Sequence, residues 1–252
     1  MDLNGKVALV TGANGGIGSA LVRGLLDKRV AKVYIAARSA AVLVELVKLD
    51  PARVVAIELD ITQMAAVKAA AASCGDTDLL INNAGVNRCV GLFSPSGMTC
   101  AREEMEVNFF GTLAMCRAFA PVLVSRGGTL VNVCSIIGLV NMPANGTYCA
   151  SKAAGHSLLQ GVRAELAPRG VQVVGVYPGP VDTRMTTGLE SPKATPEQVA
   201  AAILTGLENG DEEIFPDPMS VQVHAGLLHS PKQVEREFAT TIPACEALGE
   251  FF

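Results

Sequence analysis

Tyr148 and Lys152 are the residues of this chain whose types and spacing suggest acid–base chemistry. They are four residues apart, so on a helix both side chains lie on one face, within reach of a shared ligand. A free phenol has a pKa of about 10, which is too high for efficient proton exchange near neutral pH. A nearby ammonium stabilises the phenolate and lowers that pKa by about 1–3 units. The pair therefore predicts a general acid or base acting on a substrate oxygen.

A glycine-rich segment near the start of the chain gives a second chemical signal. It reads Thr11-Gly12-Ala13-Asn14-Gly15-Gly16-Ile17-Gly18 and lies between an expected strand and an expected helix. Glycines there permit a tight turn and close backbone approach to a pyrophosphate, and the helix N-terminus offers free N–H groups to phosphate oxygens. A glycine-rich turn alone is weak evidence, but the strand–turn–helix context favours a dinucleotide site over a purely structural turn.

Arg38 bears on which dinucleotide is bound. It stands twenty positions after Gly18, where an acidic residue would bind the ribose 2′-hydroxyl of NAD and an arginine accommodates the 2′-phosphate of NADP. The Ser39 hydroxyl adds a further donor. The sequence therefore predicts NADP(H) as the cofactor, with NAD(H) as the alternative. The alternative role for Arg38 is that of a solvated residue at the start of a helix, without contact to a cofactor.

Together these residues resemble the classical short-chain dehydrogenase/reductase family. Its motifs follow one another in order over residues 6–183 as Thr11–Gly18, Asn82-Asn83-Ala84-Gly85, Asn108, Ser135, Tyr148-Cys149-Ala150-Ser151-Lys152 and Pro178-Gly179-Pro180-Val181-Asp182-Thr183. The C-terminal third departs from the pattern. Only residues 184–195 separate the last motif from Pro196, and the Asp-Gly-Gly that many tetrameric members carry after the seventh strand is missing.

The resemblance implies a role for each matching residue. Tyr148 would be the general acid or base, Lys152 would bind the nicotinamide ribose, and Ser135 would donate to the substrate oxygen. Asn108 would distort its helix and bind a water of a proton relay, and Asn82 would tie strands together. The predicted cofactor contacts are Gly12, Asn14, Gly16, Ile17, Gly18, Arg38, Ser39, Asp60, Ile61, Asn83, Ala84, Gly85, Tyr148, Lys152, Pro178, Gly179, Val181 and Thr183.

The side chains expected around the substrate are largely apolar. They are Ser135, Ile137, Met142, Asn145, Tyr148, Pro180 and Met185, with Val86 and Cys89 opposite. We expect no Arg or Lys placed to clamp a substrate carboxylate or phosphate. The predicted reaction is hydride transfer between NADP(H) and a carbonyl or secondary alcohol of moderately hydrophobic substrates. The alternatives are an NAD-dependent alcohol dehydrogenase of the same fold and a non-catalytic NADP-binding regulatory protein, which would be expected to lose Ser135, Tyr148 or Lys152.

Strands and helices that alternate along the chain would position these residues. Strands are expected at residues 6–10, 33–36, 54–59, 79–81, 129–134, 171–176 and 213–215, and helices at 17–25, 40–49, 64–72, 99–124, 148–167, 197–207 and 232–239. The first strand is continuously apolar, as a strand buried on both faces is. This order predicts a single-domain α/β fold over residues 1–252, a Rossmann-type doubly wound parallel sheet flanked by helices on both faces. Residues 1–183 would form the cofactor and catalytic core, and 184–252 a short substrate lid with C-terminal elements.

Composition restricts the possible partners and the compartment. The net charge of −4 argues against binding nucleic acid, and the longest apolar stretch, residues 113–124, is too short to span a bilayer. The seven cysteines show no metal-ligand spacing, and the start of the chain shows no secretory signal. We therefore expect a cytoplasmic protein that acts on a small molecule and binds neither nucleic acid nor membrane. The resemblance implies a homodimer or homotetramer formed through helices 99–124 and 148–167.

Overall fold

Seven parallel strands form one sheet in the order β3-β2-β1-β4-β5-β6-β7. The computed structural model describes residues 1–242; residues 243–252, which include Cys245 and the end of the expected segment 184–252, lie outside the described residues. The strands are β1 (Val7–Thr11), β2 (Lys32–Ala37), β3 (Val54–Glu58), β4 (Leu79–Asn82), β5 (Thr129–Val133), β6 (Gln172–Val176) and β7 (Glu213–Ile214). The predicted doubly wound parallel sheet is confirmed.

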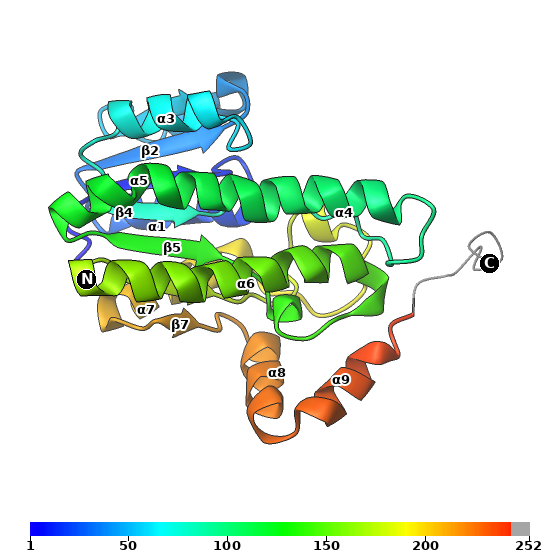
Figure 1. The fold of residues 1–252 in the computed structure, drawn as a ribbon. Helices are drawn as coiled ribbons and strands as arrows, with labels where there is room; N and C mark the ends of the chain where they lie inside the picture. Colours follow the sequence, from blue (N-terminus) through cyan, green and yellow to red (C-terminus); the bar gives the residue numbers. More distant parts are fainter. Residues whose placement is uncertain (243–252) are drawn as a thin grey trace.

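Helices cover both faces of this sheet (Figure 1). On one face lie α1 (Gly16–Asp27), α2 (Val44–Val47) and α7 (Pro196–Asn209). The other face is covered by α3 (Met64–Ser73), α5 (Thr112–Arg126) and α6 (Gly146–Leu166), and α4 (Gly97–Met105) continues into α5. The last two helices, α8 (Pro218–His229) and α9 (Pro231–Ala239), form a hairpin beside the sheet.

The sequence pattern of β1 explains the two-sided cover. Ala8 and Val10 point into the core with α1 and α7, whereas Val7 and Leu9 point into the core with α3 and α5. Successive side chains of a strand face opposite sides of the sheet, so a strand covered on both faces needs apolar residues at every position. The carboxyl ends of these buried strands meet at one edge of the sheet. The motifs that follow the strands along the chain therefore lie close together at this edge.

Two predicted helices differ from the structure, and one helix of the structure was not predicted. The helix expected at 40–49 is a 3₁₀ turn (Ala40–Leu43) followed by the single-turn α2. The helix expected at 99–124 is interrupted by a π-helical segment, Glu106–Gly111, that surrounds Asn108. Helix α8 was not predicted, although Asp217, Pro218 and Ser220 form a capping box with proline at the first helical turn, which is a local signal for a helix start.

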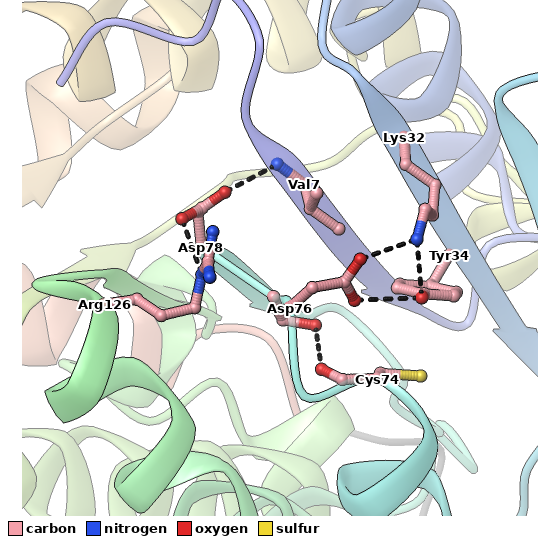
Figure 2. A network of polar contacts seen from close by, with 8 residues as sticks. Val7, Lys32, Tyr34, Cys74, Asp76, Asp78 and Arg126 are labelled. Carbon is pink, nitrogen blue, oxygen red and sulfur yellow. Dashed lines mark hydrogen bonds and ion pairs between the residues drawn. The ribbon is translucent and has the colours of Figure 1, made fainter.

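Polar contacts hold the amino-terminal edge of the sheet (Figure 2). The buried Asp78 carboxylate accepts hydrogen bonds from the Val7 backbone N–H at 2.9 Å and from Arg126 Nε at 2.8 Å. Asp76 accepts from Lys32 Nζ at 2.6 Å and from the Tyr34 hydroxyl at 2.9 Å. These contacts fix the edge opposite the cavity described below.

The helical run Gly97–Arg126 is long and apolar enough, by length and composition, to cross a membrane. The sequence had indicated a shorter apolar stretch, residues 113–124, and charged residues at the end of α4 (Arg102, Glu103 and Glu104) precede it. In the structure Met115, Phe119 and Leu123 of this run are fully buried and pack between the sheet and α3. Burial of this kind is typical of the core helix of an α/β domain.

Candidate active site

A cavity of about 1100 Å³ opens at the carboxyl ends of β1, β2, β4, β5 and β6. In open parallel α/β sheets ligands bind at this edge, where the strand order reverses. Every residue predicted to contact substrate lines the cavity except Cys89, and so does every predicted cofactor residue except Ser39. Motifs as far apart in sequence as Thr11 and Thr183 therefore line one continuous space.

The glycine turn after β1 is held against the loop after β4. Thr11 Oγ1 accepts hydrogen bonds from the backbone N–H groups of Asn83 and Ala84, both at 3.0 Å. Asn83 Nδ2 donates back to the carbonyl oxygens of Thr11 and Gly12 at 3.0 and 3.1 Å. It is thus the Asn83 side chain that joins the two strand ends, whereas Asn82, expected in that role, donates to the Cys116 sulfur of α5 at 3.6 Å.

Glycine is required where this turn closes. Gly12 has φ +62°, and a Cβ there would lie 2.9 Å from the Ala84 Cα. A Cβ on Gly18 would collide with the Gly12 carbonyl oxygen and lie 2.8 Å from the Ala13 Cα. Backbone atoms of the turn therefore pack directly against other backbone atoms, with no side chain between them. The opposite side of the turn faces the cavity.

The N-terminus of α1 faces the cavity with its N–H groups free of side-chain partners. Among the described residues no side chain caps this helix, and its first turn holds no acidic residue. Gly15, Gly16 and Ile17 line the cavity there. Free N–H groups and the positive end of the helix dipole suit a phosphate anion, so the cradle fits the pyrophosphate of a dinucleotide.

Arg38 stands at the end of β2, exposed, with its side chain on the cavity wall. Within residues 1–242 no carboxylate forms an ion pair with its guanidinium. Ser39 is exposed as well, but in the described part of the chain it is not part of the cavity wall. Asp60 and Ile61 line the same end, where Asp60 Oδ1 accepts from the N–H and hydroxyl of Thr62 at 3.0 and 2.7 Å.

Tyr148, Lys152 and Ser135 meet at the other end of the cavity and are all buried. Tyr148 and Lys152 lie on one face of α6, with Lys152 Nζ 5.6 Å from the centre of the phenol ring. Lys152 Nζ donates to the Val133 carbonyl oxygen at 2.9 Å, which fixes it to the end of β5. Ser135, two residues further along, donates to the Pro178 carbonyl oxygen at 3.4 Å.

Burial governs the protonation of these groups. It raises the pKa of the Tyr148 phenol well above its ordinary value, and the Ser135 hydroxyl opposes this shift. It lowers the pKa of Lys152, because the charged ammonium loses solvation. The expected lowering of the Tyr148 pKa is therefore wrong for the chain alone: desolvation raises this pKa, and the group that opposes the rise is Ser135, not Lys152.

The chain is similar in sequence to known proteins. A sequence model described as short chain dehydrogenase matches residues 6–194. The short-chain dehydrogenase cctT of Talaromyces islandicus is 33% identical over 184 residues, which are 71% of this chain and 64% of that protein. An uncharacterised oxidoreductase of Staphylococcus aureus is 34% identical over 218 residues, 81% of this chain and 92% of its own.

A solved structure extends this likeness to three dimensions. A short chain dehydrogenase from Burkholderia cenocepacia J2315, in complex with NADP, is 41% identical and superposes with a TM-score of 0.90 over 94% of this chain and 99% of its own. The chain belongs to the short-chain dehydrogenase family. It is accordingly an oxidoreductase of that family, as the motifs had predicted.

In this short-chain dehydrogenase Asn108 lies behind the cavity wall, not on it. Asn108 Oδ1 accepts from the Val86 N–H at 2.9 Å, and its Nδ2 donates to the Val86 carbonyl and to Ser151 Oγ, both at 2.9 Å. These bonds accompany the expected distortion of the helix. Because both amide hydrogens are used by protein acceptors, the side chain holds the Val86 loop against α6. The relay water expected at Asn108 stays a prediction.

The sequence interpretation missed one wall of the dehydrogenase cavity. Met219 of α8 and Phe238 of α9 line it, together with Thr241, whose carbonyl oxygen accepts from the Ala144 N–H at 2.9 Å. Ile136, Val140, Val223 and Val234 form a small core that packs the α8–α9 hairpin on the turn after Ser135. The apolar residues of 231–239 signalled a helix, but nothing local in the sequence signalled what it covers.

Two arginines that the sequence analysis had not placed also line the cavity. Arg88 has a half-exposed side chain paired with Glu103 at 2.8 Å, and its backbone N–H donates to the fully buried Glu104 at 2.6 Å. Arg184 donates to the Asn14 carbonyl oxygen at 3.5 Å. Neighbouring Cys89, expected on the wall, is exposed but is not among the described residues that line the cavity.

Proposed function

We propose that this dehydrogenase transfers hydride between NADP(H) and a carbonyl or secondary alcohol of moderately hydrophobic substrates, with Tyr148 as general acid or base. The observation that carries the proposal is the placement of three buried groups, Tyr148, Ser135 and Lys152, in one cavity with the uncapped N-terminus of α1. A nicotinamide cofactor supplies or accepts the hydride when bound. The protein has to bind, orient and exchange a proton.

The chain's own residues meet those needs in distinct ways. Tyr148 holds a proton on its phenol oxygen, which balances the hydride by protonating the substrate oxygen during reduction and removing that proton during oxidation. The Ser135 hydroxyl is within hydrogen-bonding reach of the Tyr148 phenol. A substrate oxygen placed beside both groups can therefore form hydrogen bonds with both. Lys152 is anchored on Val133, and we propose that it binds the nicotinamide ribose from there.

The preference for NADP(H) rests on Arg38. Its guanidinium lines the cavity without a carboxylate partner among the described residues, so it is free to bond a 2′-phosphate. The Burkholderia cenocepacia relative, 41% identical, was solved in complex with NADP, which supports the same preference. No acidic side chain follows β2 before Glu45 to bond a 2′-hydroxyl in its place.

The walls around Tyr148 favour a moderately hydrophobic substrate. Ile137, Met142, Met185, Met219 and Phe238 are among the lining residues, and methionine side chains adapt to ligands of varied shape. Arg88 does not change this preference, because Glu103 already neutralises its charge. A ketone or aldehyde with an apolar body of several carbons is the substrate class that we propose.

We further propose that two chains associate through α5 and α6. Figure 1 shows these helices lying side by side on the outer face. A groove of about 470 Å³ runs between them, lined by apolar residues such as Phe109, Leu113 and Leu158, with Arg117 and Glu165 available for ion pairs across a two-fold axis. A second copy would cover this surface.

Steady-state assays of a carbonyl and alcohol panel with NADPH and NADH test the reaction. Tyr148→Phe keeps the ring and removes the exchangeable proton, and we expect kcat to fall by about 10²–10⁴. Tyr34→Phe is the matched control, because Tyr34 bonds Asp76 at the opposite edge of the sheet, and it should leave kcat unchanged. Unchanged turnover in Tyr148→Phe, or selectivity for small anionic carbonyls, would contradict the proposal.

A further inference from the structure

Asp217 joins two parts of the cavity that are far apart in sequence. Its Oδ2 accepts from the Gly179 backbone N–H at 2.7 Å, and its Oδ1 accepts from the Ser220 N–H at 2.9 Å. The residue is only 6% exposed. One buried carboxylate therefore bonds both the Pro178–Gly179 segment after β6 and the first turn of α8.

The approach of the Gly179 backbone to the Asp217 carboxylate is close. A Cβ on Gly179 would lie 2.7 Å from Asp217 Oδ1, so the backbone has to approach the carboxylate without a side chain. Ser220 Oγ donates to the Asp217 carbonyl oxygen at 2.9 Å and accepts from its N–H at 3.2 Å, which completes a capping box. Hydrogen bonds to an ionised carboxylate are short and strong compared with neutral ones.

The two segments that Asp217 connects lie next to each other on the cavity wall, since a Cβ on Gly179 would lie 3.4 Å from the Met219 Cβ. Gly179 follows Pro178, whose carbonyl oxygen accepts from Ser135, and the nicotinamide side of the cofactor is expected there. Helix α8 begins one residue after Asp217 and carries Met219 into the substrate end of the cavity. Stacking of Phe215 on Tyr177 and on His224 supports the same junction from behind, at 5.3 and 3.8 Å between ring centres.

We propose that Asp217 is a positioning residue for the reaction. Its carboxylate fixes Gly179 on the nicotinamide side and α8 on the substrate side in one arrangement, so that hydride donor and acceptor are held at a constant relative position. The proposal rests on the function proposed above. It assigns to Asp217 a role that the family's motifs, which end at Thr183, do not contain.

Asp217→Ser separates this role from simple capping. Serine is a good N-cap and can still accept from the Ser220 N–H, but its single short side chain does not also reach Gly179. We expect kcat/KM for carbonyl substrates to fall about tenfold, because the reacting groups are no longer held in one geometry. Thr195→Ala is the matched control. Thr195 caps α7 by the same kind of bond, to the Gln198 N–H at 3.1 Å, and we expect kcat/KM to stay unchanged.

Hydrogen exchange provides a readout that needs no turnover. In wild-type protein the Gly179 amide should exchange slowly, and in Asp217→Ser about tenfold faster, while Thr195→Ala changes only the start of α7. Asp217→Asn is the second variant, because asparagine keeps the volume of aspartate. Its NH₂ group cannot accept a hydrogen bond from the N–H of Gly179 or Ser220. Exchange of the Gly179 amide should be accelerated as in Asp217→Ser.

Two outcomes would overturn the assignment. In the first, both Asp217 variants have the wild-type rate of Gly179 exchange and the wild-type kcat/KM. In the second, Thr195→Ala lowers kcat/KM as much as the Asp217 variants do. Failure of the proposed function looks different. In that case wild-type enzyme turns over no carbonyl compound with NADPH, while the exchange of Gly179 still reports whether Asp217 holds it.

Discussion

Replacement of Arg38 by alanine tests the cofactor preference most directly. The change removes the cavity-lining guanidinium at the end of β2 and leaves the glycine turn and the catalytic residues untouched. NADPH should lose affinity because its 2′-phosphate loses a charge-assisted partner, whereas NADH has no phosphate there to lose.

The magnitude follows from the exposure of Arg38 and its lack of a described carboxylate partner. A hydrogen bond to a charged group contributes about 1.5–3 kcal/mol, and solvent exposure of Arg38 places it at the lower end, about 1.5–2 kcal/mol. At about 1.4 kcal/mol per factor of ten, KM for NADPH should rise about 10–30-fold. KM for NADH should stay within about twofold, because the substitution removes a contact that only the 2′-phosphate of NADPH makes.

The assay is steady-state kinetics with each cofactor at a saturating carbonyl concentration, repeated at low and high salt. Ser39→Ala serves as the control: Ser39 is outside the described cavity wall, so both KM values should be unchanged. High salt should reduce the difference between wild type and Arg38→Ala, because the interaction is solvent-exposed. Equal effects of Arg38→Ala on NADPH and NADH would refute the reasoning and favour the NAD-dependent alternative.

Three further predictions follow from the packing and the pKa shifts. Gly18→Ala should abolish cofactor binding, measured by NADPH fluorescence titration, because its Cβ would collide with the backbone of Gly12 and Ala13; normal binding would contradict this account of the turn. Burial raises the pKa of all three tyrosines, so above pH about 10 the unfolded chain loses protons that the folded protein retains. The free energy of unfolding should therefore be unaffected by the tyrosines below pH about 10 and should fall above it. Tyrosinate absorbance should therefore rise only together with alkaline unfolding; ionisation of any tyrosine in the folded state near its ordinary pKa would disagree. Leu158→Arg, in the groove between α5 and α6, should convert a dimer to a monomer in size-exclusion chromatography, and an unchanged elution volume would exclude this interface.

Much of the fold and site could be predicted from the sequence because its signals are local. The continuous apolar run of β1 indicates burial on both faces, and the glycines of the following turn are demanded by the turn itself. Tyr148 and Lys152 share a face of α6 because their spacing matches one helical turn. Each of these conclusions depends on residues within about one element of one another, so periodicity and spacing suffice.

The sequence interpretation was incomplete where a contact depends on a distant partner. The amide of Asn108 is bonded to Val86 and Ser151, which the fold brings to it. Arg88 was not expected on the cavity wall, because its placement depends on a buried carboxylate, Glu104, on a separate helix. Nothing in the spacing of these residues indicates the contacts.

By itself, then, the sequence determined the family, the parallel sheet and the placement of Tyr148 and Lys152 on one face of a helix. Tertiary structure alone decided the environment of that pair: burial that raises the pKa of Tyr148, the wall supplied by α8 and α9, and the bond from Gly179 to Asp217. The physical reason is that turn geometry and side-chain periodicity are written in neighbouring residues. Desolvation and long-range hydrogen bonds arise only when distant segments pack together.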